Sequence, residues 1–154
     1  MSTDAGRHNE MVLALEAVIN ALHDSQKCLA DIGDRLRDES LKRYFLAESL
    51  KRASFRGDLE EFLHQSGVHD ISENGTATGM VYRVWGDLKA KLGGRDDALL
   101  AAAEKTEEEV KAAYADALGR ELPHTLRETL ANHQAHVFAS HEFLHSHRDA
   151  VTAK

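Results

Sequence analysis

The sequence has little of what interrupts helices or builds sheets. Its 154 residues include one proline and only 6% aromatic residues, a composition that favours helices over strands. The single cysteine, Cys28, excludes an internal disulfide, so a reducing cytoplasm is the expected location. No run of about 18 apolar residues is present, which excludes a membrane-spanning helix.

Positive charge is also in short supply. Lys and Arg number 19 against 26 Asp and Glu, which gives a net charge of −7 with histidine neutral. Such an acidic surface argues against nucleic acid and anionic membranes as partners. Apolar residues make up 42% and charged residues 29%, the mixture of a soluble globular domain. We expect a single domain over residues 1–154, with its folded core at about residues 7–149.

Apolar residues recur every three or four positions in five segments, which is the spacing of amphipathic helices. The expected helices cover about residues 7–32, 39–65, 78–92, 96–118 and 123–149. The third is short and lies in a long connection that can return along the molecule. This order predicts an all-α, ferritin-like four-helix bundle with a long crossover that contains a short fifth helix. A coiled-coil oligomer is the alternative, although the heptads are not strict.

Five polar residues interrupt the apolar faces of the long helices. On a helical wheel, Glu48 and Arg52 face inward from the second helix and Glu107 from the fourth. In the last helix, His133 lies among apolar residues and His136 at the edge of that face. All five are near mid-helix, so the topology predicts one central polar layer. Because an unpaired buried charge costs several kcal/mol, these groups must be satisfied by one another or by a metal.

Two interpretations of this layer follow. The first is a structural polar core made of Glu48, Arg52, Glu107 and His133, with Arg52 between the carboxylates and His133 hydrogen-bonded to one of them. The second is a metal site made of Glu48, Glu107, His133 and His136, ligands that suit iron, manganese or zinc. Arg52 argues against the second, because a fixed cation repels a metal ion. We therefore expect no cofactor, with iron or manganese as the alternative.

The tetrapeptide Glu-x-x-His, which di-iron bundles use on two helices, occurs at residues 61–64 and 142–145. The helical wheel places Glu61 and Glu142 on the solvent side of their helices. The topology also places the two motifs near opposite ends of the bundle. They therefore do not predict a shared metal centre.

Histidine is abundant, with 10 residues in the chain. A polar helix face with one or two buried histidines is the simplest interpretation. His141 and His145 lie one helical turn apart in the last helix, and a metal-binding face there is the alternative.

An ordered set of short motifs runs through the chain. It comprises Arg52 with Phe55, residues 79–89, 94–97, 104–107 and 114–118, and His141 with Arg148 and Asp149. In these motifs the chain resembles, over about residues 11–150, a bacterial family of uncharacterised ferritin-like four-helix-bundle proteins. The chain departs from that family at Tyr82, Glu108 and His133, where His, Asp and Gln are usual. The resemblance implies a ferritin-like fold, a distant relation to ferritins and rubrerythrins, and a link to bacterial stress responses.

Taken together, these features favour a ferritin-like bundle protein of unknown function that is not an enzyme, and the resemblance adds a stress-associated role. A metal-binding oxidoreductase or iron-handling protein is the alternative, so the sequence leaves enzymatic activity open. A second alternative is an interaction module that forms a homodimer, with the apolar helix around Trp85 as its surface. No nucleic-acid or membrane partner is expected.

Overall fold

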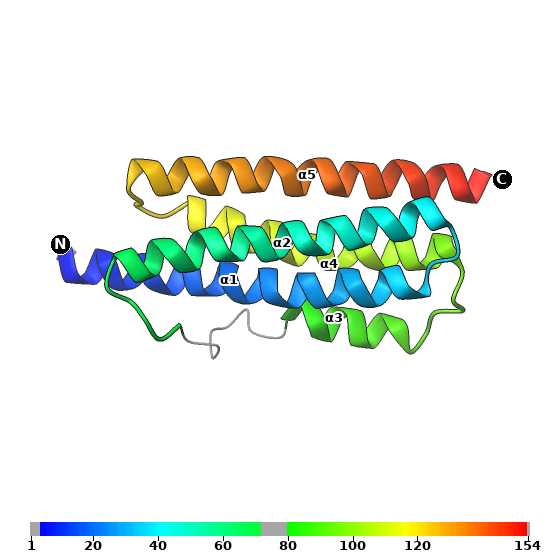
Figure 1. The fold of residues 1–154 in the computed structure, drawn as a ribbon, viewed down its shortest axis with the longest axis horizontal. Helices are drawn as coiled ribbons and strands as arrows, with labels where there is room; N and C mark the ends of the chain where they lie inside the picture. The colour runs from blue at the N-terminus through cyan, green and yellow to red at the C-terminus, as the bar shows by residue number, and fades with distance from the viewer. Residues whose placement is uncertain (1–3, 72–79, 154) are drawn as a thin grey trace.

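The computed structural model describes residues 4–71 and 80–153, which form five α-helices and no strand (Figure 1). The helices are α1 (Asp4–Arg35), α2 (Glu39–Gln65), α3 (Met80–Lys89), α4 (Asp96–Leu118) and α5 (His124–Ala153). The all-α prediction is confirmed, and α2 has the predicted bounds. Helix α1 is longer than predicted at both ends, and α3 ends three residues before the predicted position. The predicted start of α3, at residue 78, lies outside the described residues.

The long helices form two antiparallel pairs, α1 with α2 and α4 with α5 (Figure 1). Helices α2 and α4 run in the same direction, because α3 lies along the outside of α1 and leads the chain back to the end where α2 begins (Figure 1). Helix α3 packs against α1 and α4. The predicted long connection with its own helix is therefore present, and it makes α2 and α4 parallel within the bundle.

The turn between α1 and α2 is fixed by two aspartates. The carboxylate of Asp38 caps α2 by accepting a hydrogen bond from the backbone N–H of Leu41 at 2.9 Å. Asp96, the first residue of α4, accepts hydrogen bonds from the backbone N–H groups of Arg37 at 2.8 Å and Asp38 at 3.0 Å. These contacts tie the start of α4 to the start of α2 and so set the relative height of the two parallel helices.

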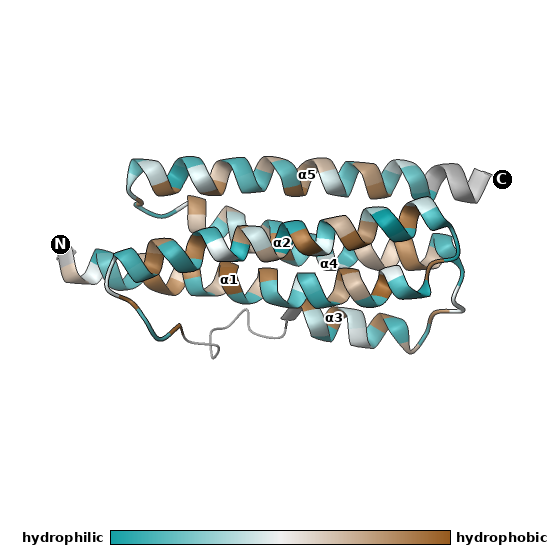
Figure 2. Ribbon diagram, in the orientation of Figure 1, coloured by the Kyte–Doolittle hydropathy of each residue, from teal (hydrophilic) through white to brown (hydrophobic). Residues whose placement is uncertain are grey.

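Each long helix is amphipathic, as the alternating brown and teal segments of α1, α2 and α4 illustrate (Figure 2). The fully buried side chains include Leu15 and Leu22 of α1, Phe45 of α2 and Val110 of α4. Burial of each such side chain stabilises the fold by roughly 1.5–3 kcal/mol. Among the described helices, none combines the length and the hydrophobicity that a membrane crossing requires.

Trp85 lies on the inner side of α3. Its side chain is 0% exposed, and its indole Nε1 donates a hydrogen bond to Asp31 of α1 at 2.6 Å. The suggestion that the helix around Trp85 offers a dimerisation surface is therefore wrong. The amphipathic pattern was interpreted correctly, but the apolar side of α3 is used to pack against the same chain.

Helices α1 and α2 come closest at Gly33. A Cβ atom on Gly33 would lie 3.0 Å from Cβ of Phe45, which is tighter than nine in ten Cβ contacts between packed residues. A larger residue here would push the two helices apart by a few tenths of an ångström, so the close contact favours glycine.

Candidate functional site

Arg52 lies at the centre of the bundle, and its side chain is 0% exposed. Its Nη1 and Nη2 atoms donate hydrogen bonds to the two carboxylate oxygens of Glu107 at 2.8 and 2.7 Å, which is a bidentate pair. Nη1 also donates to Oγ of Ser25 at 3.0 Å, and Nη2 donates to Glu48 at 3.4 Å. One guanidinium group therefore joins α1, α2 and α4.

The charges of this layer compensate one another. Burial by itself would lower the pKa of Arg52, but the charge and hydrogen bonds of Glu107 outweigh it and raise that pKa above its ordinary value. The Arg52 Nε atom is buried and makes no hydrogen bond within the part of the chain that the structure describes. Arg52 is therefore firmly charged, although its hydrogen bonding is not complete.

Glu48 connects the buried arginine to the edge of the bundle. Both of its carboxylate oxygens lie 3.0 Å from Nε2 of His136, which is partly exposed on α5. Glu48 and Arg52 are one helical turn apart in α2, as the helical wheel predicted. Glu48 is thus shared between a buried cation and a histidine that solvent can reach.

His133 belongs to a different set of hydrogen bonds. Its Nδ1 atom lies 3.1 Å from the hydroxyl of Tyr114, and its Nε2 atom lies 2.9 Å from Oδ2 of Asp58. The ring stacks on Phe55 with the centroids 4.0 Å apart. The expectation that His133 bonds to Glu48 or Glu107 is therefore wrong. A wheel gives the direction of a side chain but not its partner, and the ring reaches past the layer to Asp58.

The surroundings of His133 and Tyr114 determine which of their atoms carry protons. Burial lowers the pKa of His133, although the neighbouring carboxylate of Asp58 acts in the opposite direction. Burial also raises the pKa of the Tyr114 hydroxyl. A neutral imidazole that donates a hydrogen bond from Nε2 to Asp58 can accept a hydrogen bond from the Tyr114 hydroxyl at Nδ1. One tautomer therefore satisfies both contacts.

The four predicted metal ligands do not surround one point. Glu107 is paired through both oxygens with Arg52, Glu48 contacts His136, and His133 contacts Asp58 and Tyr114. No group of three or more His, Cys, Asp or Glu side chains within the described ranges is placed to hold a metal ion. The donor set expected for a ferritin-like metal centre therefore does not fit this layer.

The Glu-x-x-His motifs lie where the wheel placed them. Glu61 and Glu142 are exposed, and Glu61 accepts a hydrogen bond from Gln65 of its own helix at 3.0 Å. His145, which ends the second motif, instead contacts Glu104 of α4, with Nδ1 3.0 Å from Oε1.

A second cluster around Glu104 was not predicted. The Nε2 atom of His141 lies 3.6 Å from Glu104 Oε1, and Nη1 of Arg148 lies 3.1 Å from Oε2. With His145, these residues lie on one face of α5, three or four positions apart. The sequence shows the spacing of these three residues along α5. It does not show the height of α5 relative to α4, which brings them to Glu104. We call Glu104, His141, His145 and Arg148 the Glu104 cluster.

The central layer lies in a stretch of the chain that matches a known family. Residues 10–120 match a family described as a domain of unknown function (DUF2383). The chain belongs to this family. The DUF2383 region contains the whole arginine network, from Ser25 to Glu107, whereas His133 and His136 lie beyond it. No curated protein matches the chain.

Proposed function

We propose that this DUF2383 protein is a ferritin-like bundle that is not an enzyme, and that Arg52 stabilises its central layer in place of a metal ion. The direction of the helices supports the ferritin-like fold in this proposal. In a four-helix bundle with one long crossover the second and third long helices run parallel, as α2 and α4 do here. The bacterial origin and the stress-associated role are carried by the sequence resemblance alone.

The observation that carries the proposal is the bidentate pair between Arg52 and Glu107. Both oxygens of Glu107 are engaged by the guanidinium, so a metal ion would have to displace a buried arginine to reach them. Two unit charges 4 Å apart repel by about 4 kcal/mol at an effective dielectric constant of 20, and a divalent ion doubles this. The layer therefore favours the guanidinium over a metal ion.

The remaining reactive groups support a protein that is not an enzyme. Burial, followed by the nearby charge of Asp24, raises the pKa of the Cys28 thiol to about 12. Such a thiol gives almost no thiolate at neutral pH. Tyr114 is fully buried and its raised pKa keeps its proton in place. Neither group is an activated nucleophile.

Metal content tests this proposal. Tag-free protein would be expressed with added iron and manganese and measured by plasma mass spectrometry. Glu107→Ala removes the carboxylate of the layer, and Glu61→Ala is the matched control on the solvent side of α2. We expect far less than one metal per chain in all three proteins. Any binding by surface histidines would be equal among them.

One or two metals per chain in the wild type, lost in Glu107→Ala and kept in Glu61→Ala, would overturn the proposal. That result would favour the alternative, an iron- or manganese-binding oxidoreductase or iron-handling protein. The stress-associated role requires its own test, which is survival of cells with and without the protein under peroxide. Equal survival would remove that part of the proposal.

A further inference from the structure

The outward side of α2 carries two exposed leucines. Leu46 and Leu50 are 60% and 62% exposed, and they lie one helical turn apart on the same face. A single exposed leucine is ordinary on a protein surface. Two on one face of a helix that already has a complete buried face indicate a second contact surface.

A stripe of residues continues in both directions from these leucines at the spacing of a coiled-coil seam. It consists of Arg43, Leu46, Ala47, Leu50, Ser54, Gly57 and Glu61, all exposed, and we call it the α2 stripe. Its N-terminal half carries a basic residue and the large leucines. Its C-terminal half carries small residues and an acidic residue. The two halves therefore differ in both volume and charge.

Gly57 has no role in the packing of this chain. It lies inside α2, where glycine is unfavourable relative to alanine, and a Cβ atom built on it meets nothing within 4 Å. Gly33, by contrast, is favoured by the close contact with Phe45. A hollow of about 520 Å³ borders Gly57 and Glu61 on the side of α5. The small half of the stripe therefore has room for a side chain from outside.

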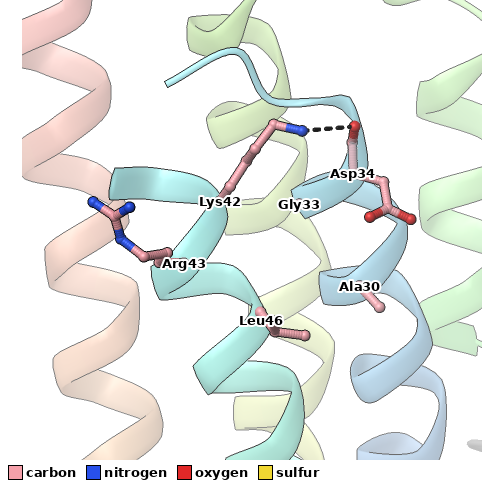
Figure 3. Close-up of a pocket in the computed structure, with 6 residues that line it drawn as sticks. All are labelled: Ala30, Gly33, Asp34, Lys42, Arg43 and Leu46. Atoms are coloured by element: carbon pink, nitrogen blue, oxygen red, sulfur yellow. Dashed lines mark hydrogen bonds between the residues drawn. The ribbon is translucent and has the colours of Figure 1, made fainter. Parts of the chain in front are cut away.

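The basic end of the stripe is also available. Figure 3 shows Lys42 turned toward α1, where its Nζ atom donates to the carbonyl oxygen of Asp34 at 3.3 Å. Arg43 points away from both residues (Figure 3) and makes no hydrogen bond or ion pair within the described part of the chain. Arg43 and Leu46 line a hollow of about 180 Å³ between α1 and α2. The guanidinium of Arg43 is thus free to pair with a carboxylate from outside.

We propose that the α2 stripe binds the α2 stripe of a second copy of this chain, antiparallel about a two-fold axis. In a two-fold interface, if one residue contacts another, the reverse contact also forms. An antiparallel alignment centred between Leu50 and Ser54 therefore places Leu50 against Ser54, Ala47 against Gly57, and Arg43 against Glu61, each pair twice.

The complementarity of the stripe determines the orientation. A parallel alignment would place leucine on leucine and Arg43 on Arg43, whereas the antiparallel one places Leu50 on the smaller Ser54 and brings the opposite charges of Arg43 and Glu61 together. The inference does not rest on the proposed function, because Arg52 and the α2 stripe lie on opposite sides of α2. A wild type that binds metal would leave it unchanged.

A charge-reversal cycle tests the alignment. The mass in solution would be measured by analytical ultracentrifugation over a concentration series for the wild type, Arg43→Glu, Glu61→Arg and the double variant. Each single variant places like charges opposite each other at two positions of the dimer. We expect each to raise the dimer dissociation constant about tenfold or more, and the double variant to restore it to within a few-fold. Glu142→Arg, an exposed reversal on α5, is the control and should leave the constant unchanged.

Volume provides an independent test. Gly57→Leu fills the small half of the stripe, so we expect the dimer to be lost while the helical circular dichroism spectrum is kept. A wild type that is monomeric at every soluble concentration would overturn the inference. Single reversals with wild-type dissociation constants, or a double variant no better than the single variants, would overturn the antiparallel alignment.

Discussion

Two carboxylates of α4, one helical turn apart, have different surroundings. Glu107 is fully buried and faces one arginine from α2 across the core. Glu104 faces two histidines and an arginine of α5, all three of which are partly open to solvent. Glu107 therefore has one charged partner, which is itself fully buried, whereas Glu104, only 7% exposed, has several charged partners that are partly open to solvent.

The difference shows how solvation decides the role of an ion pair. When one partner of a buried pair is removed, the other is left as an uncompensated charge in a medium of low dielectric constant. When one partner of a half-exposed cluster is removed, the remaining groups and water take its place. The Arg52–Glu107 pair should therefore act as scaffold, and the Glu104 cluster as an adjustable contact between α4 and α5.

The largest effect expected from this comparison is that of Glu107→Ala. The substitution leaves Arg52 buried with only Glu48 as a charged partner, so we expect a loss of about 3–5 kcal/mol in the free energy of unfolding. Urea denaturation at neutral pH followed by circular dichroism measures it. A loss below about 1 kcal/mol would mean that water reaches the layer, and the contrast with Glu104 would disappear.

Glu104→Ala should cost less, about 1 kcal/mol, because His145 and Arg148 can turn to solvent. Its contribution should also decrease as salt is added, whereas that of Glu107 should change little, since buried charges are poorly screened. Urea denaturation of both variants at low and high ionic strength gives this comparison directly. An equal salt dependence of the two would contradict the idea that the partly exposed partners of Glu104 are screened by salt.

The smallest expected effect concerns His133 and pH. Because burial lowers its pKa in the folded protein, the unfolded chain binds this proton first as the pH falls. The stability contributed by the neutral ring is therefore present above the unfolded pKa of about 6.5 and is lost progressively below it. We expect the wild type to lose more stability between pH 6.5 and pH 5 than His133→Gln, which cannot titrate. Parallel pH curves would exclude His133 as the source.

The sequence predicted the helices and the inward direction of Glu48, Arg52 and Glu107, because helical periodicity fixes the side on which a residue lies. It did not predict the partner of His133. Asp58 is 54% exposed and its position on the wheel gave no reason to pair it with a buried ring. Tyr114 lies on the buried face of α4, yet its hydroxyl takes part in the polar contacts with His133. Contacts between two helices depend on their relative height, which the periodicity of each helix alone does not contain.

The partners of Arg52 also bear on the order in which the chain folds. Ser25, Glu48 and Glu107 come from three helices, and Glu107 is 55 positions away in the sequence. During synthesis, the α1–α2 hairpin emerges before α4 exists. Until α4 is in place, Arg52 lacks its bidentate partner and has only Ser25 and Glu48 of the hairpin to contact. The bidentate pair forms only when α4 packs onto α1 and α2, so its stabilisation belongs to the assembled bundle rather than to the hairpin.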